Sequence, residues 1–132
     1  MEIFENEFIS IKIEEKNNLY IETWKSTTKD MSEEEWKSSR IKLKEIFLQY
    51  KPDKLLTLTK EFYFAISPEF QEWMAENVTK NIGHLIKKVA LIVPTDLVAE
   101  LSVEQLMEEK ETGQLSSKYF DNENDARKWI TE

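Results

Sequence analysis

The residues that could perform acid–base or nucleophilic chemistry are few, and their spacing does not favour it. Cysteine is absent, which excludes disulfides, thiolate nucleophiles and thiolate metal sites. His84 is the only histidine, and no nucleophile motif lies near it. We interpret it as a helix-end residue close to the last carbonyl groups. Two glycines thirty residues apart cannot form a phosphate-binding loop. We therefore expect no enzymatic activity.

Carboxylates are abundant and could form acid–base pairs or bind a hard cation. The acidic runs at 33–35 and 108–111 fall at hydrophilic ends of expected helices, where such runs are usually solvated. The stretch "DNENDA", 121–126, alternates acidic residues like the start of a calcium loop. It lacks the turn glycine and the closing glutamate of such a loop. We expect helix capping there, with no metal and no cofactor.

Ser67 lies where an apolar run gives way to a helical pattern, in "YFAISPEFQEWM". Pro68 suits the first helical position, and the Ser67 hydroxyl can accept a hydrogen bond from the amide of Phe70. A serine in this place can also carry a phosphate. Ser67 is therefore a candidate phosphosite or helix cap, and capping alone accounts for the local pattern.

Aromatic residues crowd the same segment. Three consecutive aromatics at 62–64 cannot all point inward from an extended chain, because side chains alternate between its two sides. At least one should be exposed or should line a crevice at the carboxyl end of a strand, where open α/β sheets bind ligands. The candidate partner or ligand surface comprises Thr59, Phe62, Tyr63, Phe64, Phe70 and Trp73.

The first half of the chain predicts a hairpin and a well-capped helix. "EFISIKIEE" and "LYIETWK" alternate apolar and polar residues on either side of Asn17 and Asn18, as two half-buried strands would. Ser32 and Glu35 form a capping-box pattern ahead of a helical stripe, and Pro52 follows the expected helix end.

The second half predicts alternating strands and helices. "KLLTLT" is a short strand, and the helix after Ser67 should bury a stripe formed by Phe70, Trp73, Met74, Asn77, Val78 and Ile82. "KKVALIV" is expected to be a central strand covered on both faces. A helix should follow Pro94, with a second cap at Ser102. "QLSSKYF" should be the last strand, followed by a terminal helix capped by Asp121 or Asn122.

The expected fold is therefore α/β, in the order β-β-α-β-α-β-α-β-α. We expect one domain, 1–132, with a mixed, mostly parallel sheet of four or five strands and 89–93 near its middle.

Charge and hydropathy limit the partners. With 18 basic and 26 acidic residues the net charge is −8, which disfavours nucleic acid and anionic membrane surfaces. The longest apolar run is far shorter than the roughly 20 residues that span a bilayer, and "MEIFENEF" does not have the pattern of a signal peptide. We expect a cytoplasmic protein without membrane insertion, as a monomer or a weak homodimer.

The element order, "LLTLTKEFYFAISPEFQEW", "KKVALIV" and "YFDNENDARKWI" together resemble the SpoIIAA-like branch of the STAS superfamily, over about residues 8–129. The resemblance implies a STAS-like sandwich. Anti-sigma-factor antagonists of that superfamily carry a phosphorylatable serine at the start of the helix after the third strand, in an Asp-Ser-Ser/Thr-Gly type of motif. Only Ser67 carries over from that motif. An apolar residue replaces the aspartate, and Pro68 replaces the glycine.

Two functional hypotheses follow. The first is a non-enzymatic cytoplasmic regulatory or protein-interaction module, whose working surface is the loop 59–66 with the start of the following helix. The alternative is a carrier or sensor of a small apolar or lipid-like ligand, held in a crevice lined by Phe62, Phe64, Phe70 and Trp73.

Overall fold

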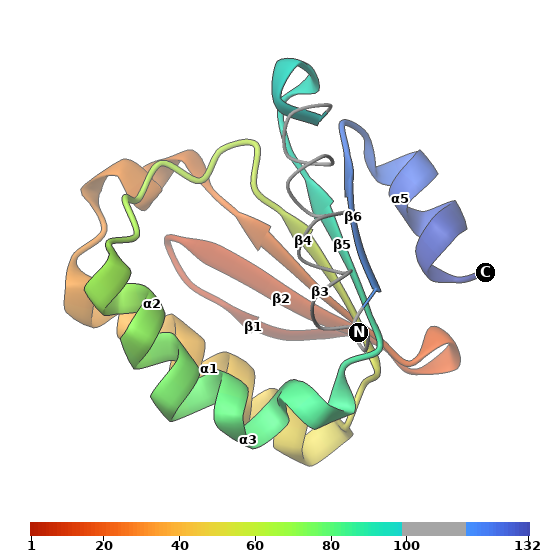
Figure 1. Ribbon diagram of the computed structural model, residues 1–132, viewed down its shortest axis with the longest axis horizontal. Coiled ribbons are helices and arrows are strands. Elements are labelled where there is room, and N and C mark those ends of the chain that lie inside the picture. Colours follow the sequence, from red (N-terminus) through yellow and green to blue (C-terminus); the bar gives the residue numbers. More distant parts are fainter. Residues whose placement is uncertain (99–115) are drawn as a thin grey trace.

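A computed structural model describes residues 1–98 and 116–132 and has an α/β fold around one mixed sheet (Figure 1). The sheet has six strands in the order β1-β2-β3-β4-β5-β6. The first three strands are antiparallel, and the pairs from β3 to β6 are parallel. The strands are β1 Glu2–Glu5, β2 Ile9–Glu14, β3 Leu19–Trp24, β4 Lys54–Leu58, β5 Lys88–Ile92 and β6 Ser116–Phe120.

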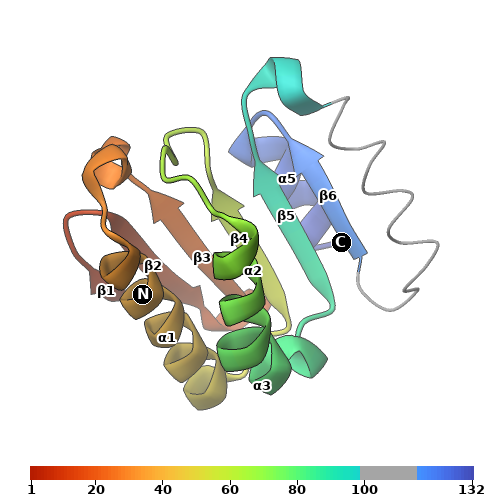
Figure 2. The same ribbon diagram turned by 60° about the vertical axis from the view of Figure 1, so that its left-hand side comes forward.

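Helices cover both faces of the sheet (Figure 2). One face carries α1 and the continuous segment of α2, a π-helical turn η3, and α3. The other face carries α5, next to β5 and β6. The bounds are α1 Glu33–Tyr50, α2 Pro68–Met74, η3 Ala75–Thr79, α3 Lys80–Ile82 and α5 Glu123–Ile130. Short 3-10 turns are η1 Glu15–Asn17, η2 Ser26–Asp30 and η4 Gly83–Leu85.

The predicted hairpin and the capped helix are confirmed. β2 and β3 pair antiparallel, and Asn18 closes the turn in the left-handed region with φ 54°. Ser32 and Glu35 form both hydrogen bonds of the capping box at the start of α1. Asparagine tolerates the left-handed conformation, and the box satisfies two backbone donors, so both features follow from local chemistry.

The apolar side chains form two layers, one on each face of the sheet. On the α1 side, isoleucines of β2 and Tyr20 of β3 pack against Trp36, Leu43 and Phe47 of α1. On the α5 side, the buried residues are Leu19, Ile21, Leu56, Ala90, Ile92, Ala126 and Ile130. The two layers exist because helices cover both faces, so β3 is buried on both sides.

Several expectations about the sheet and the second helix are wrong. The sheet has six strands because the short β1 pairs with β2 through an irregular register. β5 is not central, because it lies next to the edge strand β6. Its side chains Val89 and Leu91 are only half-buried. Asn77 does not join the inward stripe. It is exposed, and its Nδ2 donates to the carbonyl oxygen of Trp73 at 2.9 Å.

The end of the chain follows the expected pattern where it is described. Residues 95–98 are helical, and α5 is capped by Asn122, whose side chain accepts a hydrogen bond from the amide of Asp125. The expected second cap at Ser102 and the acidic run at 108–111 lie outside the described residues. Within residues 1–98 and 116–132, no helix is both long and apolar enough to cross a membrane.

Replacing Ile130 with Ala tests the smaller apolar layer. Ile130 is fully buried against the sheet, so Ile130→Ala should lower the free energy of unfolding by about 2–5 kcal/mol in urea titrations. Leu48→Ala is the matched control, because Leu48 is 49% exposed on α1 and should change that free energy by less than about 0.5 kcal/mol. Equal losses in the two variants would contradict the packing of α5.

Candidate ligand-binding site

A cleft of about 500 Å³ opens on the sheet face that carries α1 and α2. Its floor is a row of side chains from four neighbouring strands, because Glu22 pairs with Thr57, Thr57 with Leu91, and Leu91 with Tyr119. Its walls come from α1, the loop 59–66, α2 and η3. The described residues that line it are Glu22, Trp24, Trp36, Arg40, Thr57, Thr59, Phe62, Ile66, Gln71, Met74, Ala75, Thr79, Leu91, Val93 and Tyr119.

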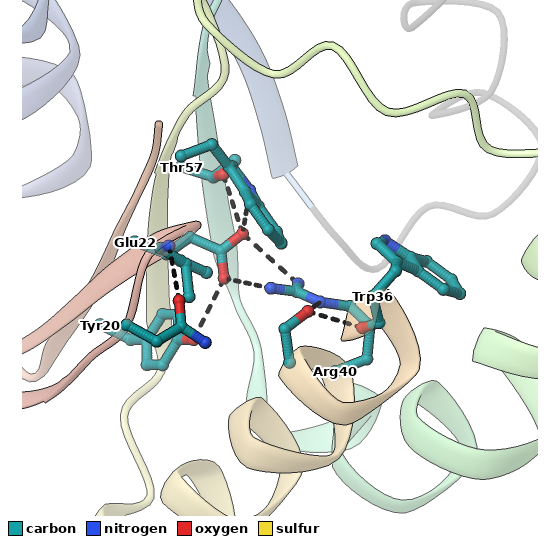
Figure 3. A network of polar contacts seen from close by, with 9 residues as sticks. Tyr20, Glu22, Trp36, Arg40 and Thr57 are labelled. Atoms are coloured by element: carbon teal, nitrogen blue, oxygen red, sulfur yellow. Dashed lines mark hydrogen bonds and ion pairs between the residues drawn. The ribbon is translucent and has the colours of Figure 1, made fainter. Parts of the chain in front are cut away.

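The carboxylate of Glu22 is the polar centre of the cleft floor (Figure 3). The residue is only 3% exposed. Its Oε1 accepts hydrogen bonds from the Tyr20 hydroxyl at 3.1 Å and from Arg40 Nη2 at 3.1 Å. Its Oε2 accepts from Trp24 Nε1 at 3.0 Å, Thr57 Oγ1 at 3.0 Å and Arg40 Nη1 at 3.4 Å. These five hydrogen bonds engage both oxygens.

Arg40 supplies the compensating charge from α1. Its guanidinium forms an ion pair with Glu22 while lying 4.7 Å from the ring centroid of Trp24. Its Nε donates to Ser39 Oγ at 3.2 Å, and that hydroxyl donates to the carbonyl oxygen of Trp36. Both members of the pair are buried, so each needs the other to offset its lost hydration.

Tyr20 stays a hydrogen-bond donor in this network. Burial, and then the negative charge of Glu22, raise the pKa of its hydroxyl well above the ordinary value. The protonated phenol therefore donates to Glu22 throughout the physiological range. The period of two along β3 places Tyr20, Glu22 and Trp24 on the same face, which is why three successive inward side chains join one network.

The predicted aromatic surface divides into two parts. Phe62 lines the cleft and contacts Trp24 edge-on, with 4.7 Å between ring centroids. Phe64, Phe70 and Trp73 do not line it. They surround Trp36 instead, at centroid distances of 6.0, 5.6 and 5.8 Å. The prediction of one crevice lined by all four aromatics is therefore wrong, because only Phe62 lines the cleft and the other three pack around Trp36.

The loop 59–66 alternates as the consecutive aromatics predicted. Phe62 and Phe64 are half-buried, whereas Tyr63 is 58% exposed and Ile66 39% exposed. At the start of the loop, Thr59 donates to the carbonyl oxygen of Ile92 from both its amide and its hydroxyl. Thr59 also lines the cleft, so the predicted surface residues within this loop face in two directions, and Phe70 and Trp73 lie on α2.

The buried Thr28 of η2 holds this loop in place. Its hydroxyl donates to the carbonyl oxygen of Glu61 at 3.0 Å and accepts from the amide of Tyr63 at 2.9 Å. These two hydrogen bonds clamp the loop on either side of Phe62 and so fix the rim of the cleft.

Ser67 caps α2 as the sequence predicted. Its hydroxyl accepts from the amide of Phe70 at 3.2 Å, and Pro68 occupies the start of the helix. Ser67 does not line the cleft. The preceding residue, Ile66, does line it, and the helix that Ser67 caps contributes Gln71 and Met74 to the wall.

Sequence reasoning missed the two charged residues that line the cleft. Glu22 falls in a clear alternation between Tyr20 and Trp24, which places it on a face with two large aromatics. Arg40 lies four residues after Trp36 and three before Leu43, on the stripe expected to be buried. A carboxylate and a guanidinium, each on an apolar face, were the signal for a buried ion pair.

The remaining candidates for chemistry in the described part of the chain do not line the cleft. His84 is exposed in η4. Glu35 caps α1, and Glu33 pairs with Lys37 at 2.9 Å on the surface. Within the described part of the chain no group of three or more histidines, aspartates or glutamates could hold a metal ion.

Comparison of the chain with protein-family models, with curated proteins and with solved structures finds no match.

The clamp on the loop can be tested with Thr28→Val, which keeps the shape of the side chain but removes both hydrogen bonds. The free energy of unfolding should fall by about 1–3 kcal/mol, and the amide hydrogen of Tyr63 should exchange much faster. Thr23→Val is the matched control, since Thr23 is exposed on β3. Unchanged Tyr63 exchange in Thr28→Val would contradict the clamp.

The cap at Ser67 predicts a graded response. Ser67→Ala should lower the free energy of unfolding by about 1 kcal/mol, whereas Ser67→Asp should leave it nearly unchanged because a carboxylate also caps and suits the helix dipole. Ser38→Ala, on the exposed side of α1, serves as the control in the same chemical denaturation series. If Asp proved as costly as Ala, capping would not explain this residue.

Proposed function

We propose that this chain is a non-enzymatic binding module that takes a small, mainly apolar molecule into the cleft, as a carrier or sensor. The supporting observation is the cleft itself. Its volume of about 500 Å³ lies within the range of about 300–1,000 Å³ that is usual for small-molecule sites. Nine of the fifteen described lining residues are aromatic or otherwise apolar, and the exposed surface of the lining is mainly apolar, as in such sites generally.

The position of the cleft in the sheet also favours a ligand. Thr59 lies just beyond the carboxyl end of β4, and Val93 directly follows β5. Open parallel sheets bind ligands outside the carboxyl ends of their strands, where the loops diverge. The loop 59–66 and α2 diverge from the sheet here and form one wall.

The polar groups in the lining favour binding over catalysis. Glu22 is the only carboxylate among the described lining residues, and five hydrogen bonds already engage its oxygens. A general base needs a free lone pair within reach of the substrate proton, and Glu22 offers none. The described lining also contains no histidine or lysine that could replace it.

A regulatory protein-interaction role is the second candidate, favoured by the exposed side chains of Tyr63 and Ile66. In this proposal the chain is a cytoplasmic STAS-like module, a monomer or weak homodimer, and a protein partner contacts the loop 59–66. The β2–β3 hairpin followed by parallel β-α-β units, with Ser67 opening the helix after β4, supports the STAS-like assignment.

The binding proposal is tested by filling the cleft. Octanamide is a suitable neutral probe, and its binding should shift the ¹H–¹⁵N signals of Phe62 and Leu91. Ala75→Trp places a large ring in the cleft without removing a buried contact, and should weaken octanamide binding at least about tenfold. Glu76→Trp, at the next and exposed position outside the lining, should bind like the wild type.

Native mass spectrometry of protein from its source cell adds an independent measurement. A copurified small molecule in the wild type that is lost from Ala75→Trp would support the proposal. Octanamide binding that Ala75→Trp leaves unchanged would contradict it, and so would an absence of binding at millimolar concentrations.

A further inference from the structure

We propose that the cleft selects electrically neutral ligands that present a hydrogen-bond acceptor, and that the Glu22–Arg40 pair makes this selection. The inference rests on the proposed function, because it specifies the chemistry of the molecule that enters the cleft. It distinguishes a neutral amide, ester or ketone from a fatty-acid-like carboxylate and from an alkylammonium ion.

The exclusion of charge follows from the composition of the lining. Glu22 and Arg40 are the only charged residues among the described lining residues, and they are joined at 3.1 Å. Their charges cancel within the floor. A carboxylate placed beside Arg40 would also lie beside Glu22, and an ammonium beside Glu22 would also lie beside Arg40. Either ion would lose its hydration in an apolar cleft without gaining an unshared counter-charge.

At the Glu22–Arg40 pair, the preference for an acceptor follows from the donors that remain there. Glu22 already accepts the side-chain donor hydrogens of Trp24, Thr57 and Tyr20. Arg40 carries five N–H groups, and within the described part of the chain three of them are engaged, one to Ser39 and two to Glu22. Two guanidinium N–H groups are left at a residue that lines the cleft. A neutral carbonyl oxygen can accept from them without adding a charge.

The pair is also rigid, which makes the selection sharp. The guanidinium is held by Glu22 on one side, by Ser39 Oγ at its Nε and by the face of Trp24. Arg40 cannot leave Glu22 to neutralise an incoming carboxylate without exposing a buried, unpaired carboxylate on Glu22. The cost of that separation is the reason why an anionic ligand should bind weakly even though an arginine lines the site.

A matched series of probes tests the inference by calorimetry or by amide-shift titration. Octanamide, octanoate and octylammonium share one chain length and differ in the charge of the head group. On the wild type, octanamide should bind at least about tenfold more tightly than either ion, which corresponds to about 1.4 kcal/mol.

Glu22→Gln should change the order of affinities. It leaves Arg40 without a counter-charge beside the cleft, so octanoate should gain at least about tenfold and become the tightest of the three. The double variant Glu22→Gln with Arg40→Gln removes both charges and should return the preference to octanamide. Tryptophan fluorescence and thermal unfolding establish that each variant is folded before its affinities are compared.

The binding results distinguish a failure of this inference from a failure of the proposed function on which it rests. Octanoate or octylammonium binding the wild type as tightly as octanamide would overturn the inference and leave the binding proposal in place. Binding of none of the three probes to the wild type would overturn both. If Glu22→Gln does not fold, the relative affinities of the three probes for the wild type still decide whether the inference holds.

Discussion

The buried carboxylate of Glu22 is the interaction on which the rest of this structure depends. Its five hydrogen bonds come from β3 itself, from β4 through Thr57, and from α1 through Arg40. A carboxylate can be buried only when its oxygens are satisfied, so these elements must meet at one point. Removing one partner of a buried pair typically costs about 3–5 kcal/mol, because the other charge remains buried. The network thereby fixes where α1 lies on the sheet.

The cleft results from two different kinds of attachment on the same sheet face. α1 is held on the sheet by the charged network in addition to apolar packing, whereas α2 is joined to α1 through aromatic contacts of Phe70 and Trp73 with Trp36. These aromatic contacts fix α2 against α1, and the cleft lies between α2 and the row of Thr57, Leu91 and Tyr119. The ion pair is therefore buried by its own partners and still lines the cleft.

Local signals predicted the elements of this fold better than their arrangement. The capping box at Ser32, the cap at Ser67 and the Asn18 turn involve residues within four positions of one another, so the sequence alone predicted them. The position of β5 next to the edge depends on which strand pairs with β6, a long-range property. Glu22 was missed for a related reason. Alternation shows which residues share a face of β3, but only the packing of α1 and α5 determines that both faces are buried.

The loop 59–66 connects the two functional proposals physically. Its alternation turns Phe62 into the cleft and Tyr63 outward, while Thr28 holds the backbone between Glu61 and Tyr63. A ligand against Phe62 and a protein against Tyr63 would therefore contact adjacent residues of one clamped segment. If a ligand changed the affinity for a partner, the partner would change the affinity for the ligand by the same factor. In such a sensor the buried pair would select the ligand and the loop would carry the signal, with no catalytic group required in either step.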